Sequence, residues 1–216
     1  DFARLLIACG ARAITPHIPG SELQGVVRLD SFEETRHILQ LAKRGRRAIV
    51  VGGGITALEL VEGLRERGVW VSYLVRGERY WQNVLDETEA RIVESRLVQE
   101  GVQIYHRTEL AEIVGRNGKV IGVRTTDGRQ LTCDLVGIAI GVTPRKELGE
   151  AAGLTVEKGI LVDDTMRTSL ADIYAAGDVA QVYDARLGKA IVDSLWDPAR
   201  AQGRTAGMNM IGRAEH

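Results

Sequence analysis

The sequence predicts an α/β fold: a Rossmann-like parallel sheet with helices on both faces, accompanied by a β-meander. Two observations carry this prediction. Residues 48–51 form an unbroken apolar, mostly β-branched run that leads through a glycine cluster into a segment with helical apolar spacing. At 110–126 the pattern changes to two short strands around Asn117-Gly118, a dipeptide that suits a tight hairpin turn.

Length and composition describe an ordinary soluble globular chain. Of 216 residues, 44% are hydrophobic and 26% are charged, and the formal net charge is -1 at pH 7. No net basic field attracts nucleic acid or an anionic membrane, so we expect neither partner. No apolar run approaches the roughly 20 residues that span a bilayer, and the first residues lack signal-peptide character, which favours the cytoplasm.

The two cysteines and the ends of the chain add two expectations. Cys9 and Cys133 lie too far apart in sequence for a zinc pair or a CxxC motif, so we expect no metal and two buried, reduced thiols. The chain lacks an initiating methionine and opens within what reads as a strand. We interpret it as a piece of a longer protein.

The first elements are a short strand and a helix. Residues 5–10 form an apolar run ended by glycine, and residues 16–20 mark an irregular exit that we interpret as a domain boundary. Asp30 or Ser31 is the expected cap of a helix that runs to about Lys43, with one of the two following glutamates closing a capping box.

A β-α-β unit follows, and one more helix and strand extend it. The strand at 47–51 precedes a helix that ends at Gly68, and the apolar segment 70–75 is the second strand. A further helix at about 86–100 ends at Gly101, and residues 102–105 read as a third strand. The order predicts that the parallel sheet continues.

The last third of the chain begins with another buried strand. After the turn at Asp127-Gly128, residues 135–140 are apolar, and Pro144 ends regular pairing, which marks a second boundary. Beyond it we expect a short helix near Leu148, strands at 159–162 and 173–176, and a helix after Pro198.

The glycine cluster fits the pattern G-x-G-x-x-G/A at the junction of a buried strand and an amphipathic helix. That pattern is typical of a turn that holds a dinucleotide pyrophosphate. Gly52 allows a tight turn, Gly54 permits close backbone approach to the phosphates, and Ala57 lets the helix pack closely on the strand. The expected cofactor-binding residues here are Gly52, Gly53, Gly54, Ile55, Thr56 and Ala57.

The residues after the second strand indicate which nicotinamide cofactor binds. NAD-specific folds place an acid there for the ribose 2′-hydroxyl, whereas this chain has Arg76 and, nearby, Arg79. Because a guanidinium pairs well with a 2′-phosphate, we favour NADPH over NADH. Two alternatives stay open: Arg76 is solvated or stacks on adenine, and Glu78 serves the ribose hydroxyl. Glu59 either faces the cofactor or lies on the surface.

Four segments together resemble the pyridine nucleotide-disulfide oxidoreductase superfamily, which includes nitrite-reductase-like, NADH-oxidase-like and rubredoxin-reductase-like flavoproteins. Residues 6–12 resemble its ATGAxP turn, 52–59 its NAD(P) turn, 140–144 its GxxP motif and 168–180 its second flavin motif. In that family the NAD(P) domain is inserted into an FAD domain. The resemblance therefore implies an FAD-domain remnant at 1–22, an NAD(P) domain at 23–142 and a second FAD segment at 143–216.

The same resemblance implies further cofactor-binding positions. In the family the aspartate of the second flavin motif bonds the ribityl chain of FAD, although an aspartate at such a strand end equally suits a turn cap. These implied positions are Gly10, Gly141, Gly177, Asp178 and Val179. The family's first FAD pyrophosphate motif is absent from this chain, so we expect FAD in the intact enzyme rather than in this piece alone.

The function implied is hydride transfer from NAD(P)H to FAD and onward to an acceptor, by a parent enzyme that resembles dimeric members of the family. We name no acid–base residue, because the cofactors perform the electron chemistry. The acceptor is either a redox-partner protein or a small molecule. The alternative is a dinucleotide-binding module with no activity of its own in this piece.

Overall fold

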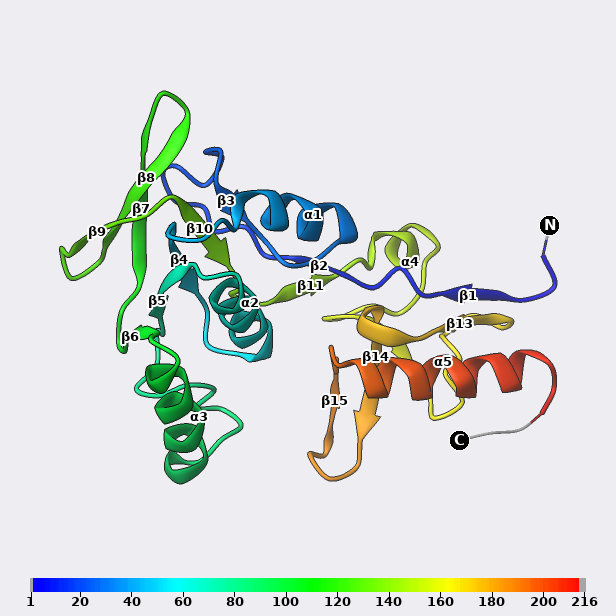
Figure 1. Ribbon diagram of the computed structural model, residues 1–216. Helices are drawn as coiled ribbons and strands as arrows, with labels where there is room; N and C mark the ends of the chain where they lie inside the picture. The colour runs from blue at the N-terminus through cyan, green and yellow to red at the C-terminus, as the bar shows by residue number, and fades with distance from the viewer. Residues whose placement is uncertain (1, 214–216) are drawn as a thin grey trace. The chain divides into compact units, whose positions relative to one another are not determined.

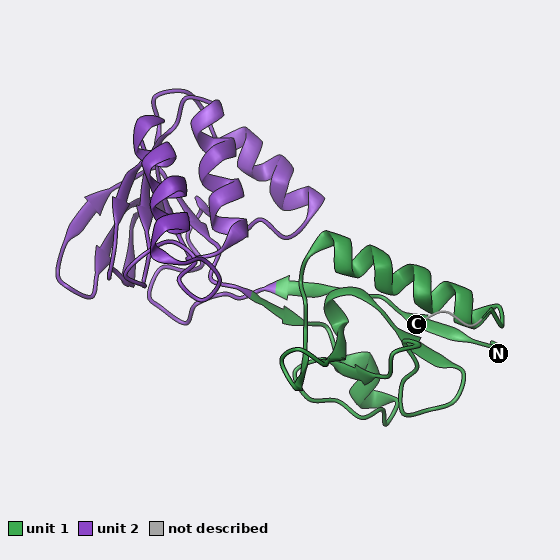
Figure 2. Cartoon of the chain, turned by 90° about the horizontal axis from the view of Figure 1, so that it is seen from below, with its two compact units in different colours: residues 1–12, 142–216 green, residues 13–141 purple. Residues whose placement is uncertain are grey.

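The computed structural model describes residues 2–213, whose elements can be followed in Figure 1. Two compact units divide the chain: residues 13–141 form unit 2, and residues 1–12 with 142–216 form unit 1 (Figure 2). The segment expected to belong to the FAD remnant, 1–22, is therefore split. Its second half joins unit 2, where Ile14 N donates to Gly141 O at 3.0 Å and Ile113 N donates to Pro19 O at 2.9 Å.

A five-stranded parallel sheet forms the centre of unit 2. Every neighbouring pair of strands is parallel, so all their carboxyl ends meet at one edge. The strands run in the order β3 (Val26–Val27), β10 (Leu135–Ile138), β4 (Arg47–Val51), β5 (Trp70–Leu74) and β6 (Gln103–Tyr105). The predicted α/β class with a parallel sheet is confirmed.

The helices of unit 2 contribute to one hydrophobic core. Buried residues of α1 (Phe32–Leu41), α2 (Ile55–Glu66) and α3 (Glu87–Gln99) share a cluster with side chains from the sheet. The other sheet side chains, among them Ile49 and Ile138, pack instead against the predicted meander. Its strands are β7 (Leu110–Arg116), β8 (Lys119–Thr125) and β9 (Gln130–Thr132).

The expectation of helices on both faces is therefore wrong for this sheet. The meander takes the place of the second helical layer, because its strands turn apolar residues inward. Ile113, Val120 and Val123 are all buried in the shared core, whereas their neighbours Arg116 and Lys119 at the hairpin are exposed. An antiparallel sheet with one apolar face can cover a parallel sheet as a helix would.

Two of the three helices begin with a side-chain cap, and the cap of α1 is one of the two residues predicted for it. Ser31 Oγ accepts from Glu34 N at 3.1 Å, but the reciprocal half of the expected capping box is missing and one Glu34 oxygen is buried without a partner. At α3 the box is complete: Asp86 accepts from Glu89 N at 2.8 Å, and Glu89 accepts from Asp86 N at 2.9 Å. Helix α2 has no side-chain cap.

Unit 1 is built around helix α5 (Trp196–Met210), which packs against η1 (Gly177–Val179) and strand β13 (Ile173–Ala175). The helix was expected only after Pro198, yet it begins before it, because proline is tolerated in the first turn. The remaining elements of the chain are β1 (Leu5–Ile7), β2 (Ala11–Ala13), β11 (Val142–Pro144), α4 (Glu147–Ala151), β12 (Ile160–Val162), β14 (Ala180–Asp184) and β15 (Lys189–Ile191).

The pairing in unit 1 joins segments far apart in the sequence. β1 pairs in parallel with β13, so that Leu6 lies beside Tyr174. β12, β14 and β15 form a three-stranded sheet, whose β14–β15 hairpin was not predicted. Within residues 2–213 no helix is long and apolar enough to cross a membrane.

Candidate nucleotide-binding site

The turn between β4 and α2 requires glycine at its first position. A Cβ on Gly52 would lie 2.1 Å from the carbonyl oxygen of Ala139 and 3.0 Å from the Cβ of Ala57. Neither neighbour can move easily, because Ala139 directly follows β10 and Ala57 is completely buried. The backbone of the turn therefore passes closer to β10 than any side chain permits.

The first turn of α2 is open to an anion. Gly54 is its N-cap, with extended backbone and no side chain to accept hydrogen bonds, and the first turn carries no acidic residue. The N–H groups of Ile55, Thr56 and Ala57 have no acceptor within the helix, because no helical carbonyl precedes them by four residues. Together with the helix dipole they form a site suited to a phosphate.

Gly53 and Glu59 flank this turn. Gly53 is exposed, and a Cβ there would meet nothing within 4 Å, so the space on its side-chain side is open. Glu59 is exposed on the next turn of α2. Burial, with contributions from Glu62 and Glu59, raises the pKa of the Tyr80 hydroxyl to about 12, so Glu59 lies near the segment that follows β5.

The segment of residues 76–86, here called the β5–α3 loop, leaves the sheet at the same edge as the glycine turn. Its first residue, Arg76, is exposed, and among the described residues none makes a hydrogen bond or ion pair with its guanidinium. Glu78 forms an ion pair with Arg107 at 2.8 Å, with both side chains more than half exposed. Glu78 is thus partly neutralised, and Arg76 is left available for a ligand.

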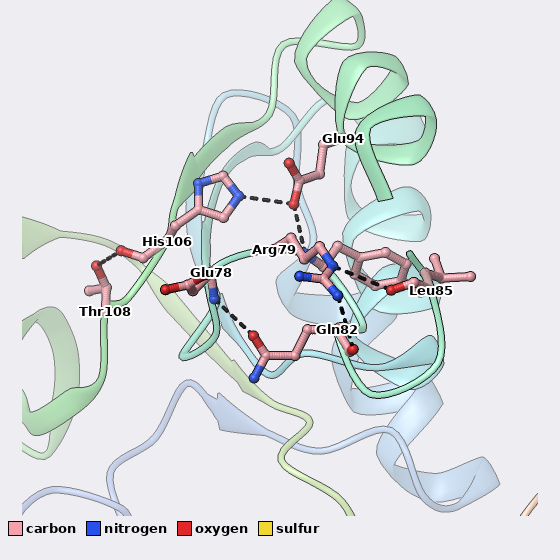
Figure 3. A network of polar contacts seen from close by, with 8 residues as sticks. Glu78, Arg79, Gln82, Leu85, Glu94, His106 and Thr108 are labelled. Atoms are coloured by element: carbon pink, nitrogen blue, oxygen red, sulfur yellow. Dashed lines mark hydrogen bonds and ion pairs between the residues drawn. The ribbon is translucent and has the colours of Figure 1, made fainter. Parts of the chain in front are cut away.

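Arg79 differs from Arg76 in its surroundings. Its Nε donates to the carbonyl oxygen of Leu85 at 3.3 Å, and its Nη2 donates to that of Gln82 at 3.4 Å. Figure 3 shows the guanidinium directed into its own loop. These two contacts tie Arg79 to its own loop, in contrast to the unpaired guanidinium of Arg76.

Glu94 of α3 holds the same loop from the other side (Figure 3). One carboxylate oxygen accepts from Tyr80 N at 2.7 Å and lies 2.9 Å from His106 Nε2. The Glu94 side chain is 18% exposed and that of His106 37%, so the contact with Tyr80 N is the more shielded of the two. The loop that carries Arg76 is therefore fastened to α3 and to the end of β6.

Two residues near the site were missed by the sequence reasoning. Arg107 lies two residues after the end of β6, as Arg76 lies two residues after the end of β5, and inspection of the exit of the third strand would have found it. The second residue is Trp81 of the β5–α3 loop. Its N donates to the carbonyl oxygen of Gly53 at 3.0 Å, a contact that no local sequence pattern signals.

Of the positions implied by the family resemblance, Gly141 lies in unit 2. It follows β10, at the edge where the glycine turn lies, and has a φ of +119°. Its carbonyl oxygen accepts from Ile14 N at 3.0 Å. The other four positions, Gly10, Gly177, Asp178 and Val179, belong to unit 1.

In unit 1 the second flavin motif forms a tight turn at the end of β13. Gly177, with a φ of +76°, donates its N–H to Gln202 Oε1 at 2.8 Å, and Val179 is buried. Burial, with a smaller contribution from Asp193, raises the pKa of the Asp178 carboxyl above its usual value. No other described side chain bonds this carboxylate, so it suits a ligand hydroxyl, as the ribityl chain of FAD would provide.

The remaining predictions about unit 1 concern Gly10 and Cys9. Gly10 has a φ of +68°, and its carbonyl oxygen accepts from Arg145 N at 2.9 Å. The expectation of two buried thiols is wrong for Cys9, which is exposed and donates to the carbonyl oxygen of Arg145 at 3.0 Å. Cys133 is buried as expected, and burial raises its pKa to about 12.

The parallel sheet, the glycine turn and the helix that follows it define a Rossmann-type α/β protein. The chain belongs to the pyridine nucleotide-disulphide oxidoreductase family, whose model matches residues 1–203. The family resemblance seen in the sequence is thereby confirmed.

Three characterised relatives illustrate the range of this family. The NADH oxidase of Methanocaldococcus jannaschii is 35% identical over 98% of this chain and 48% of its own length. The nitrite reductase [NAD(P)H] of Bacillus subtilis is 31% identical over 98% of this chain and 25% of its own length. The rubredoxin-NAD(+) reductase of Pseudomonas putida is 35% identical over 83% of this chain and 46% of its own length. The chain thus spans between a quarter and about half of these relatives.

Solved structures agree with the sequence relatives. The NAD-dependent persulfide reductase from A. fulgidus superposes with a TM-score of 0.93 at 35% identity, covering 98% of this chain and 40% of the other. An engineered water-forming NADPH oxidase bound to NADPH superposes with a TM-score of 0.90 at 25% identity, covering 100% of this chain and 48% of the other. Among the five substitutions that define that oxidase, two introduce arginine and one removes an aspartate.

Proposed function

We propose that this chain is the NAD(P)H-binding portion of an FAD-dependent oxidoreductase that passes hydride from NAD(P)H to FAD and on to an acceptor. The family relationship supports the reaction class. The relatives carry names with different acceptors, so the step they share lies upstream of the acceptor. The acceptor of this protein is a redox-partner protein or a small molecule.

The observation that carries the proposal is the close backbone approach at Gly52. Its missing side chain lets the turn lie against Ala139, and the uncapped N-terminus of α2 then faces the space in front of the turn. A pyrophosphate there would accept hydrogen bonds from the free N–H groups that follow Gly54. An acidic side chain near this turn would repel the pyrophosphate, and the first turn of α2 has none.

We extend the proposal to a preference for NADPH over NADH. The position directly after Val75 is an exposed arginine rather than an acid, and the nearest acid in the loop, Glu78, is paired with Arg107. Arg76 then meets the ribose 2′-phosphate, while Arg79 stabilises the loop. The engineered oxidase, which binds NADPH after gaining two arginines and losing an aspartate, supports the same electrostatic logic.

FAD belongs to the proposal for the intact enzyme. When bound, it would supply the isoalloxazine ring that accepts hydride from the nicotinamide. Asp178 would accept a hydrogen bond from a ribityl hydroxyl, because its carboxylate is half-buried and unpaired with other described side chains. The role of this chain's residues is to bind and orient the two cofactors; none of them is proposed to transfer a proton.

The test of the proposal is a calorimetric titration of the 216-residue chain with NADPH and NADH in parallel, repeated with Arg76→Ala. The unaltered chain should bind both dinucleotides and bind NADPH more tightly. Arg76→Ala should weaken NADPH binding by roughly 1–3 kcal/mol, the worth of a charge-assisted pair, and change NADH binding little.

A matched control is Arg116→Ala, which removes an equal charge from the end of β7 at the exposed β7–β8 hairpin. It should leave the affinities for both cofactors unchanged. Equal losses for NADPH and NADH in Arg76→Ala would contradict the NADPH preference. Absence of binding by the unaltered chain would contradict the nucleotide site itself.

A further inference from the structure

Trp81 has an unusual backbone for a bulky residue. Its φ is +45°, in the left-handed region that aromatic side chains rarely occupy. Three backbone hydrogen bonds hold it there: its N donates to Gly53 O at 3.0 Å, and its O accepts from Val84 N and Leu85 N, both at 2.9 Å. Strain that its surroundings maintain in this way is typical of functional sites.

This conformation places the indole over the glycine turn. The nearest heavy atom to a Cβ built on Gly54 is Trp81 Nε1, at 3.8 Å. The ring is partly buried, lies 6.1 Å from the ring of Tyr80 and contacts the main core of unit 2. It is therefore a packed side chain whose polar edge lies at the N-terminus of α2.

The indole N–H has no acceptor among the described residues, although a tryptophan N–H in a packed position ordinarily finds one. The indole nitrogen is not one of the buried polar atoms that lack a hydrogen-bond partner, so it keeps some exposure to solvent. The indole N–H is thus an unused donor beside Gly54, the N-cap whose following N–H groups are also unused within the helix.

We propose that Trp81 is a further nucleotide-binding residue, whose indole N–H donates to the pyrophosphate of the bound dinucleotide. This inference rests on the proposed function. The pyrophosphate is common to both cofactors, so Trp81 contributes equally to NADPH and NADH, whereas Arg76 contributes to NADPH alone. The strained backbone is the means by which the loop holds the indole over the turn.

The test compares Trp81→Phe with the unaltered chain by calorimetric titration with each dinucleotide. Phenylalanine keeps an aromatic ring in the core and removes the donor. Loss of a hydrogen bond to a charged group should weaken the binding of NADPH and of NADH by the same factor, about tenfold. The thermal midpoint of each variant verifies folding, and Trp81→Leu is the second donor-free variant if Trp81→Phe does not fold.

Trp70→Phe is the matched control. Trp70 begins β5, at the edge of the sheet opposite to the glycine turn, and is 60% exposed. Its substitution should leave both affinities unchanged. A spectroscopic readout separates contact from a general structural effect: NADPH bound by Trp70→Phe should still quench tryptophan emission strongly, and Trp81→Phe at saturating NADPH should lose most of that quenching.

The outcomes separate the two levels of the argument. If the unaltered chain binds neither dinucleotide, the proposed function fails and this inference fails with it. If the unaltered chain binds and Trp81→Phe binds equally well, only the role of Trp81 is overturned. Tighter binding by Trp81→Phe would also overturn it, because the indole would then be obstructing the turn.

Discussion

At the scale of single residues, neighbouring glycines in one turn meet different physical demands. Gly52 has a φ of +156° and no room for a Cβ, since the backbone of Ala139 lies in the way. At Gly53, by contrast, a Cβ would enter open space. The pattern G-x-G-x-x-G/A requires glycine at the first position and leaves the second free, and the space around the two residues gives the steric reason.

Gly52→Ala should therefore destabilise the chain by about 2 kcal/mol, since a methyl group forced against a backbone carbonyl must displace β10 or the turn. The urea midpoint of unfolding measures this effect. Gly53→Ala is the matched control and should change stability by less than about 0.5 kcal/mol. Equal destabilisation by the two substitutions would show that the turn is not packed against Ala139 as described.

At the scale of secondary-structure elements, the three helices of unit 2 differ in how they begin. α1 and α3 have oxygen caps from Ser31 and Asp86, whereas α2 starts at Gly54 with none. In the capped helices a side-chain oxygen already accepts from an N–H group of the first turn. The uncapped helix leaves the N–H groups of its first turn without a side-chain acceptor, as the proposed pyrophosphate site requires.

Asp86→Ala should lower the free energy of unfolding by about 1 kcal/mol, because it removes the carboxylate that accepts from Glu89 N. Chemical denaturation monitored by circular dichroism measures the change. Asn83→Ala, an exposed substitution in the same loop, should have a much smaller effect. If both variants behave alike, the capping box does not stabilise α3.

At the scale of the whole molecule, unit 2 is continuous in sequence and unit 1 is not. Residues 13–141 contain both cores of the parallel sheet, the glycine turn and the β5–α3 loop. Unit 1 is assembled from the two flanking segments around a separate core. A unit with its own core and no chain break can in general fold alone.

Residues 13–141, produced without the flanking segments, should fold cooperatively and bind NADPH with an affinity close to that of the 216-residue chain. Circular dichroism melting and calorimetry measure the two properties. A shorter piece, residues 13–134, lacks β10, which lies between β3 and β4, and should not fold. A folded 13–141 piece that binds no dinucleotide would show that residues outside unit 2 complete the site.

The sequence by itself determined the class of fold, most strands and helices and the family. Apolar periodicity, glycine and capping residues act over a few positions, so the β4 to β5 unit and the cap at Ser31 follow from neighbours in the chain. The motif at 52–57 needs only a strand before it and a helix after it, and both are visible as local patterns.

Only the tertiary structure decided which side chains meet. Arg79 turns into its own loop while Arg76 stays free of other described residues, and Trp81 lies over a turn that is 27 positions away at Gly54. The meander replaces a helical layer for the same reason: either layer can bury an apolar sheet face, and packing between distant segments decides between them. Local propensity does not contain this information, because these contacts exist only once the chain is folded.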